Sequence, residues 1–481
     1  MRIFRKVFLT SSILLNIAVF SLGMSPEFFE NLTGIVTFIF VLSILVLVHE
    51  AGHFFIAKKA GIKVEVFSLG FGRKILKRKI GDTEYCLSSL PLGGYVKMAG
   101  DEPQEEREGT PWEYLSQPPG KRALVVFAGP LMNYIFAFFV FALVLFIGKP
   151  ESSTKIGPPE EGKPAQLSNL LIGDEIIAIN KINVRSWYEM VETIRNNKNP
   201  RKQLTIKRGT QIFDVVVQAN MEEKKDILGR DIYVPVIGVV PYFSRTVEGF
   251  TKDSPAKDIG LQVGDEIVSV EGEDVLDGLT ILDLISQKQD KIKLSVLRDG
   301  KKIDFQVVPD IITVKENDEK LADLGIIFSQ DIVILKYGIW GAFSHAGGEI
   351  FKLTRLTYTA FGRLFTGKMS LRKAGTGPVG IAFISIQIAA KGIIYVLLLL
   401  ASLSVSLAIV NLLPFPVLDG GHILFLLIEK IRGKALSLQV QENINKIAVA
   451  LLILLFLYIT WSDLEKFKII DNIIKKFPLH K

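Results

Sequence analysis

The sequence predicts a multi-pass α-helical membrane protein that also carries two small α+β domains outside the bilayer. Three observations support this fold class. Several apolar segments are long enough to cross a membrane, one stretch recurs at a fixed displacement, and another alternates apolar and polar residues between glycines. The composition agrees, because the 481 residues are 49% hydrophobic yet 22% charged, a mixture typical of membrane proteins with soluble domains.

The basic residues indicate membrane orientation rather than nucleic-acid binding. Lys and Arg number 57 against 50 Asp and Glu, which gives a formal net charge of +7. The basic residues cluster beside apolar segments, where the positive-inside bias explains them, so no nucleic-acid partner is expected. The single cysteine, Cys86, excludes an intramolecular disulfide.

The N-terminus begins with an extra apolar segment. Residues 7–24 follow Arg2, Arg5 and Lys6, a pattern shared by signal peptides and membrane anchors. Because no clear small-x-small cleavage site follows, the sequence favours an uncleaved anchor.

Four further segments are expected to cross the bilayer, at about 33–57, 123–147, 393–413 and 447–461. Most are long enough, or nearly so, for a hydrocarbon core of about 30 Å. The loop after 33–57 is rich in Lys and Arg and is therefore expected in the cytoplasm, which places residues 148–390 and the C-terminus outside. Five lysines after Trp461 disagree with this placement of the C-terminus.

The outer region contains an internal repeat. "NLLIGDEIIAINKINV" (169–184) matches "GLQVGDEIVSVEGEDV" (260–275) at a displacement of 91 residues, and strand patterns follow both copies. Two domains of about 80–90 residues are therefore expected, and their Gly-Asp-Glu-Ile core resembles the bacterial type of PDZ domain. PDZ grooves bind an extended peptide by strand addition, so peptide C-termini are expected ligands; the alternative is that the domains are spacers with empty grooves.

Two further segments are expected at the membrane surface. Residues 63–102 alternate apolar and polar residues between glycines, which predicts a β loop that re-enters the membrane beside the span at 33–57. Residues 336–372 have an amphipathic pattern and are expected to lie on the outer interface. The chain is therefore expected to divide into nine segments. They are the N-terminal apolar segment (1–30), the helix with H-E-x-x-H (31–62), the β loop (63–120), a second helix (121–149), two α+β domains (150–225 and 226–315), the amphipathic region (316–390), a third helix (391–430), and the last helix with the tail (431–481).

The span at 33–57 contains ionisable side chains, which are costly to bury in lipid. His49, Glu50 and His53 form an H-E-x-x-H pattern, and the i, i+4 spacing puts both imidazoles on one helix face, where they can bind one zinc ion. Glu50 is placed to take a proton from a zinc-bound water. The five-residue pattern means little in a soluble protein, but ionisable residues inside a membrane span are rare and usually functional.

A catalytic zinc usually has three protein ligands and an open position for water, so one ligand is missing from this pattern. The chain has only five histidines, so a carboxylate or His422 is expected to complete the set. Asp419 follows two prolines in "NLLPFPVLDGGH" (411–422), at the same membrane level as His49. An aspartate there is costly unless it faces a partner such as zinc; the alternatives are Asp419 as a helix cap or surface residue, with His422 as the ligand.

In these motifs the chain resembles the site-2 proteases, the intramembrane zinc metalloproteases of peptidase family M50, and among them bacterial members with tandem PDZ domains. The resemblance covers nearly the whole chain from about residue 33. The matching segments are "HEAGHF" (49–54), "FSLGFG" (67–72), "PLGGYVKM" (91–98), "AGPLMN" (128–133), "GPVGI" (377–381) and "NLLPFPVLDGGH" (411–422). Shorter family members begin near the span at 33–57, so Met24 is an alternative start of the protein.

The resemblance implies a role for each site residue. Zinc is held by His49, His53 and Asp419, and Glu50 is the catalytic acid/base. Asn411 contacts the substrate or the reacting carbonyl. The β loop receives the substrate strand, and the part of the loop around Gly93, Gly94, Tyr95 and Val96 is expected to offer it an edge strand.

The expected function is therefore zinc-dependent cleavage of membrane-spanning segments in the inner membrane of a bacterium. The expected substrates are single-span membrane proteins, such as an anti-sigma factor, or remnant signal peptides, with the PDZ domains screening what enters. The active site is expected towards the cytoplasm and the PDZ domains outside. Two alternatives are a proteolytically silent PDZ scaffold, disfavoured by the intact Glu50, and a transporter, disfavoured by the uneven set of spans.

Overall fold

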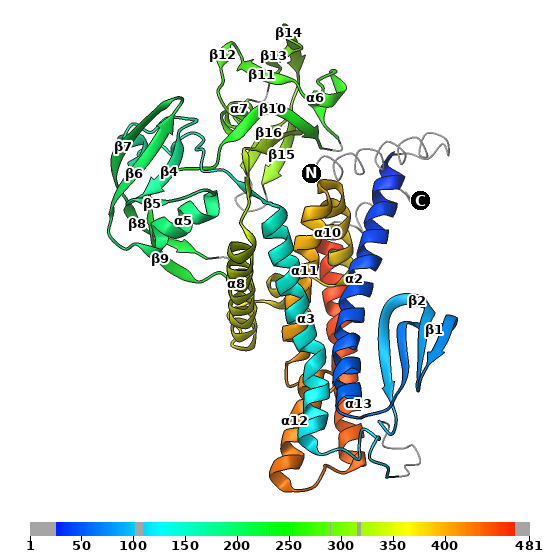
Figure 1. Cartoon of the computed structure of the whole chain (residues 1–481). Helices are drawn as coiled ribbons and strands as arrows, with labels where there is room; N and C mark the ends of the chain where they lie inside the picture. The colour runs from blue at the N-terminus through cyan, green and yellow to red at the C-terminus, as the bar shows by residue number, and fades with distance from the viewer. Residues whose placement is uncertain are drawn as a thin grey trace. The chain divides into compact units, whose positions relative to one another are not determined.

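The computed structural model describes residues 26–101, 109–226, 228–251, 253–288, 290–314 and 319–466 (Figure 1). The N-terminal segment expected at 7–24 and the tail after Lys466 lie outside these residues. The chain divides into two units, which are described separately. One comprises Met1–Ile147 with Tyr337–Lys481, and the other is Gly148–Lys336.

The first unit is built from helices. Among the described residues, four helices are long and apolar enough to cross a membrane: residues Leu32–Lys59 of α2, and α3, α11 and α13. A multi-pass membrane protein is therefore supported at the level of helix length and composition. The helices run α2 (Pro26–Lys59), α3 (Pro119–Ile147), α8 (Ile339–Phe365), α9 (Leu371–Ala374), α10 (Pro378–Lys391), α11 (Ile393–Asn411), α12 (Asp419–Arg432) and α13 (Leu438–Lys466).

Small residues bring α2, α3 and α11 close together. A Cβ atom added to Gly52 of α2 would lie 2.2 Å from the carbonyl oxygen of Ala128 on α3, so only glycine permits this approach. The Ser404 hydroxyl of α11 donates a 2.9 Å hydrogen bond to the backbone carbonyl of Asn133 on α3. These contacts make a tight three-helix core around α3.

The chain breaks between α11 and α12. The fourth span was expected to reach residue 413, but α11 ends at Asn411 because Pro414 and Pro416 oppose helical backbone before them. α12 then begins at Asp419. A Cβ atom on Gly420 would lie 2.2 Å from the Leu413 carbonyl oxygen, so the first turn of α12 packs directly onto the broken segment.

Strands β1 (Val64–Ile80) and β2 (Thr83–Met98) form the expected β structure after α2 (Figure 1). Each strand bends, since residues 66–69 have partners on two sides, at 94–97 and at 84–87. Residues 94–98 pair only with residues 64–69 and therefore form an edge, with no further strand beside them among the described residues.

The second unit contains the predicted repeat. The first copy holds β4 (Glu175–Ile179), β5 (Ile182–Asn183), α5 (Trp187–Asn196), β6 (Arg201–Arg208) and β7 (Gln211–Gln218). The second holds the same elements, whose first residues are displaced by 90 or 91 positions: β11 (Glu266–Val270), β12 (Glu273–Asp274), α7 (Gly278–Ser286), β13 (Ile292–Arg298) and β14 (Lys301–Val307). The sequence repeat is thus a structural repeat.

Each copy has its own sheet and core. The first sheet has the order β5-β4-β6-β7, and the second has β14-β13-β11-β10-β17 with β12 on β11. Ile176, Met190 and Leu204 are buried in the first core, and Ile267 and Leu294 in the second. The remaining elements are β3 (Lys149–Ser152), α4 (Pro164–Leu167), β8 (Asn220–Lys225), β9 (Asp231–Val236), β10 (Phe243–Phe250), α6 (Pro255–Asp258), β15 (Asp310–Val314), β16 (Glu319–Asp323), β17 (Ile326–Gln330) and β18 (Ile332–Leu335).

The two copies also share an ion pair. Arg208 donates to the buried Asp174 at 2.7 Å in the first copy, and Arg298 donates to the buried Asp265 at 2.6 Å in the second. Each pair joins the turn before the first strand of its copy to the end of the third, because Asp174 and Asp265 directly precede β4 and β11. The repeated Gly-Asp motif is therefore explained by a buried anchor for the turn.

Candidate active site

His49 and His53 form the centre of the site on α2. Both side chains are buried, and their Nε2 atoms lie 3.2 Å apart because one helical turn separates the two residues. The His53 Nδ1 donates to the Val125 carbonyl oxygen of α3 at 2.9 Å. A carbonyl only accepts, so neutral His53 presents an unprotonated Nε2 to the site.

Asp419 faces these two nitrogens from the first residue of α12. Its Oδ2 atom lies 3.1 Å from His49 Nε2 and 3.6 Å from His53 Nε2. This oxygen is buried and accepts no hydrogen bond from the described residues. A buried carboxylate oxygen without a donor, opposite two imidazole nitrogens, is an arrangement that a cation would stabilise.

The three atoms fit a zinc ion. Ligand atoms bound tetrahedrally at 2.0–2.1 Å lie about 3.3 Å from one another. The separations here are 3.2, 3.1 and 3.6 Å, and the candidate ligand atoms all lie within 4.8 Å of one another. Two imidazoles and one carboxylate are also a donor set that catalytic zinc uses, with a fourth position left for water.

Glu50 lies beside the histidines and faces the β loop. Its carboxylate accepts a hydrogen bond from the backbone N–H of Val96 on β2. A Cβ atom on Gly94 would lie 3.6 Å from Glu50 Cγ and 2.7 Å from the Ser68 carbonyl oxygen. The edge formed by residues 94–98 therefore packs directly against the general base expected from the sequence.

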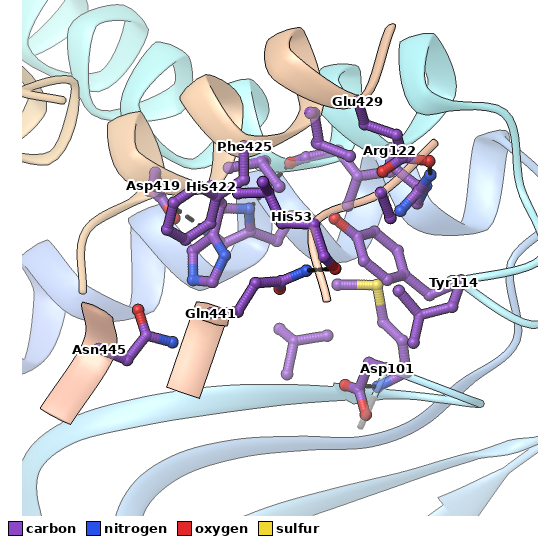
Figure 2. A pocket seen from close by; sticks show the side chains of 18 of the residues that line it. His53, Asp101, Tyr114, Arg122, Asp419, His422, Phe425, Glu429, Gln441 and Asn445 are labelled. Atoms are coloured by element: carbon purple, nitrogen blue, oxygen red, sulfur yellow. Dashed lines mark hydrogen bonds and ion pairs between the residues drawn. The ribbon is translucent and has the colours of Figure 1, made fainter. Parts of the chain in front are cut away.

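A cavity of about 920 Å³ opens onto this group (Figure 2). Asp419, His422, Phe425 and Glu429 face it from α12, and Gln441 and Asn445 face it from α13. Other lining residues include Glu50, Tyr95, Asp101, Tyr114 and Arg122. The lining is thus rich in polar groups, although the helices that carry the histidines and Asn133 are apolar enough to span a membrane.

Comparisons with known proteins agree with this geometry. The profile of peptidase family M50 matches residues 37–455, which include all three candidate ligands. The chain belongs to peptidase family M50. Regulator of sigma-E protease RseP from Escherichia coli K12 is 31% identical, over 90% of this chain and 99% of that protein. Protease RseP from Yersinia pestis is 33% identical over the same shares.

A Neisseria meningitidis serogroup A protein, provisionally named a zinc metalloprotease, is 32% identical over 90% of this chain and 99% of its own length. As an M50 peptidase this chain is a zinc metalloprotease, so the predicted enzyme class, intramembrane proteolysis and zinc cofactor are confirmed. The PDZ domain of the SdrC-like protein from Listeria monocytogenes is 22% identical over 18% of this chain and 90% of that domain, with a TM-score of 0.15. That score is too low to support an argument about the fold.

The structure also places Asn411 and the β-loop residues that were expected in the site. Asn411 ends α11 with its Nδ2 atom 3.4 Å from His49 Nε2. Tyr95 and Val96 line the cavity. Gly93, with a φ of +147°, lies at the bend of β2, where a Cβ atom would be 2.2 Å from the Phe71 ring.

His422, the alternative ligand, lines the same cavity from the next turn of α12. It does not belong to the cluster of ligand atoms found among the described residues, which contains His49, His53 and Asp419 alone. The arrangement therefore favours Asp419 as the third ligand of this M50 peptidase.

Sequence reasoning assigned no role to the face of α3 that supports the histidines. Val125 accepts from His53, Gly129 makes room for both rings, and the Asn133 side chain lies 3.3 Å from His49 Nδ1. A Cβ atom on Gly129 would lie 2.4 Å from His53 Nε2. The available signal was the i, i+4, i+8 spacing of these three residues, which matches the spacing of the histidines across two packed helices.

Proposed function

We propose that this M50 peptidase cleaves single-span membrane proteins within their membrane segments, using zinc held by His49, His53 and Asp419. The observation that carries the proposal is a cavity of about 920 Å³, lined by many polar side chains, that reaches a candidate ligand cluster. Two of the three candidate ligands lie on α2, which is long and apolar enough to cross a membrane. A hydrolase that acts inside a bilayer needs both a helix that crosses it and a wet cavity that admits water.

Glu50 is the proposed acid/base. Bound zinc would supply a Lewis acid that polarises the scissile carbonyl and activates water. Glu50 takes the proton of the attacking water and passes it to the leaving amine. Its hydrogen bond from Val96 N–H holds the carboxylate towards the β loop, where the substrate backbone is proposed to lie.

The edge at residues 94–98 is proposed to hold the substrate as an added strand. A membrane helix must unwind before its peptide bond can be cut, and its freed N–H and C=O groups then need partners. An unpaired strand edge supplies such partners, and Gly94 brings this edge within van der Waals reach of Glu50. The Asn411 amide, near His49 Nε2, is proposed to donate to the developing oxyanion, a contact typically worth about 3–4 kcal/mol.

The proposed location is the inner membrane of a bacterium, with the active site towards the cytoplasm. α2 ends in Lys58 and Lys59, and β1 continues with Arg73, Lys74 and further basic residues. This clustering supports a cytoplasmic position for the C-terminal end of α2 and for the β loop, which is proposed to re-enter the membrane.

The repeats of the second unit are proposed to be tandem extracytoplasmic PDZ domains that bind peptide C-termini. β17 is the last strand in its sheet, and α7 packs beside it, since a Cβ atom on Gly278 would lie 2.8 Å from the Phe328 ring. A strand edge next to a helix is the arrangement into which PDZ ligands insert. The two PDZ domains would then admit only substrates whose outer domain another protease has already removed.

The names of the relatives suggest one substrate class. Proteins named regulator of sigma-E protease are similar over almost their whole length, so an anti-sigma factor is the first proposed substrate. Remnant signal peptides are the second, because they are also short single-span segments.

The test uses the full chain in liposomes with a tagged single-span substrate, with and without a zinc chelator. We expect cleavage within the membrane segment that stops on chelation and returns with zinc. Glu50→Gln should bind zinc and leave the substrate intact. Full cleavage by that variant would remove Glu50 from the mechanism, and no cleavage by the wild type would favour the silent scaffold.

A further inference from the structure

Asn133 is a fully buried residue on the face of α3 that supports the histidines. Its Nδ2 atom lies 3.3 Å from His49 Nδ1. Its Oδ1 atom is buried and has no hydrogen-bond partner among the residues that the structure describes. A buried amide with one end towards a candidate zinc ligand and the other end unsatisfied needs a physical explanation.

The proton on the His49 ring supplies that explanation. Asp419 lies at the Nε2 side of His49, so Nε2 must carry a lone pair when it binds a metal, and the single ring proton must then be on Nδ1. A protonated Nδ1 needs an acceptor. The amide Nδ2 cannot accept, whereas the amide oxygen can, and a half-turn of the Asn133 amide brings that oxygen to Nδ1.

The neighbouring histidine follows the same rule. His53 Nδ1 donates to the Val125 carbonyl, eight residues before Asn133 on the same face of α3. Gly129 lies between them, and its missing side chain leaves room for both imidazoles. One face of α3 therefore meets both histidines: Val125 accepts from His53, Gly129 leaves room for the two rings, and Asn133 lies beside His49.

We propose that Asn133 is a positioning residue whose side-chain oxygen accepts the His49 Nδ1 proton and fixes His49 as a zinc ligand through Nε2. The hydrogen bond from Ser404 to the Asn133 carbonyl, 2.9 Å long and buried, holds this turn of α3 in place. Outer partners of metal-bound histidines typically change metal affinity by about 10–100-fold when they are removed. The inference rests on the proposed ligand role of His49.

The test measures zinc affinity, using the purified full-length protein stripped of metal and titrated against a fluorescent zinc indicator. Asn133→Leu keeps the branched shape of the side chain but removes the acceptor, and we expect an affinity about 10–100-fold lower. Asn133→Asp can only accept, so we expect an affinity equal to or above that of the wild type. Ser385→Ala, which removes a polar group from a fully buried residue on α10, is the control and should leave the affinity unchanged.

The opposite pattern overturns the proposal. If Asn133→Leu binds zinc as tightly as the wild type, or Asn133→Asp binds as weakly as Asn133→Leu, the amide oxygen is not the partner of His49. The variant His49→Ala tests whether His49 is a zinc ligand at all. If that variant keeps its zinc, the proposed ligand role of His49 is wrong, whatever the Asn133 variants show. As a second readout, ¹⁵N shifts of the five histidine rings in the metal-free protein should show His49 losing its Nδ1-protonated form in Asn133→Leu.

Discussion

Arg122, in the first turn of α3, forms an ion pair with Glu429 on α12, 307 residues later in the chain. Both side chains are mostly buried, and both line the cavity that Asp419 also lines (Figure 2). The Arg122 Nε atom also donates to the Gln117 carbonyl at 3.0 Å. Because the segment before α12 is broken by two prolines, this pair is a long-range anchor for the helix that carries Asp419.

The anchor predicts a charge-dependent loss of stability. Glu429→Gln leaves the Arg122 charge buried without its partner, which typically costs about 3–5 kcal/mol. We expect a lower unfolding temperature in detergent together with weaker zinc binding, because α12 is freed at its far end. The charge-swapped double variant Arg122→Glu with Glu429→Arg should recover part of both; equal losses in the single and double variants would show that the pair does not anchor α12.

The ligand set predicts different outcomes for two residues of α12. Asp419→Ala should lower zinc affinity by more than the about 10–100-fold typical of losing a partner behind a ligand, because it removes an oxygen proposed to bind zinc directly. His422→Ala should retain zinc, since His422 lies outside the ligand cluster. Metal content after dialysis measures both. The reverse result would make His422 the third ligand.

The acid/base role predicts that Glu50→Gln separates metal binding from catalysis. The amide keeps the shape of the side chain but cannot take a proton from water, so cleavage should fall by about 10²–10⁴-fold. Zinc content should stay at the wild-type level, because Glu50 does not belong to the ligand cluster. Loss of zinc in this variant would indicate a structural role instead.

The close approach at Gly129 predicts a steric effect on the metal site. In Gly129→Ala, the added methyl group would lie 2.4 Å from His53 Nε2 and 2.9 Å from His49 Cε1, so at least one ring must move. We expect weaker zinc binding with the helix intact. Gly348→Ala on α8 is the matched control, because a Cβ atom there meets nothing within 4 Å, and it should be neutral or stabilising by about 0.5–1 kcal/mol.

The ion pair of the second repeat predicts how stability depends on pH. Burial alone would raise the pKa of Asp265, but the hydrogen bonds from Arg298 and from the Gln262 N–H, together with the Arg298 charge, outweigh burial and hold that pKa below its ordinary value. A carboxyl with a lowered folded-state pKa adds stability that is present above its unfolded pKa, about 3.9, and is lost as the pH falls through the folded pKa.

Hydrogen-exchange protection of β11 and β13 between pH 5 and 2, corrected for intrinsic exchange, measures this loss. Arg298→Gln should lower protection at pH 5 and flatten its fall towards pH 2, because less of the carboxylate's stabilisation remains to be lost. An unchanged slope in the variant would mean that Arg298 does not set the pKa of Asp265.

Tyr114, which lines the cavity from the loop before α3, has a strongly altered acidity. Burial raises the pKa of Tyr114 to about 12, so this phenol remains protonated and can donate a hydrogen bond at any physiological pH. Sequence patterns gave no reason to single out Tyr114, because its burial depends on the packing of the loop before α3 against the cavity.

The sequence by itself determined the chemistry and much of the architecture. The spacing of His49 and His53, the apolar spans and the 91-residue repeat are local patterns, and helix and strand periodicity converts them directly into structure. The family motifs pointed to Asp419, although 370 residues separate it from His49. The end of α11 was missed by two residues, because Pro414 restricts the backbone before it more strongly than hydropathy indicates.

Only the tertiary structure decided which groups support the ligands. The contact of Asn133 with His49, the space left by Gly129, the Arg122–Glu429 pair and the edge at residues 94–98 all join segments far apart in the chain. Nothing in local periodicity fixes such contacts, because they depend on how two helices are rotated and staggered against each other. The residues that can bind zinc were readable in the sequence, whereas the hydrogen bonds that orient them exist only once α2, α3 and α12 are packed together.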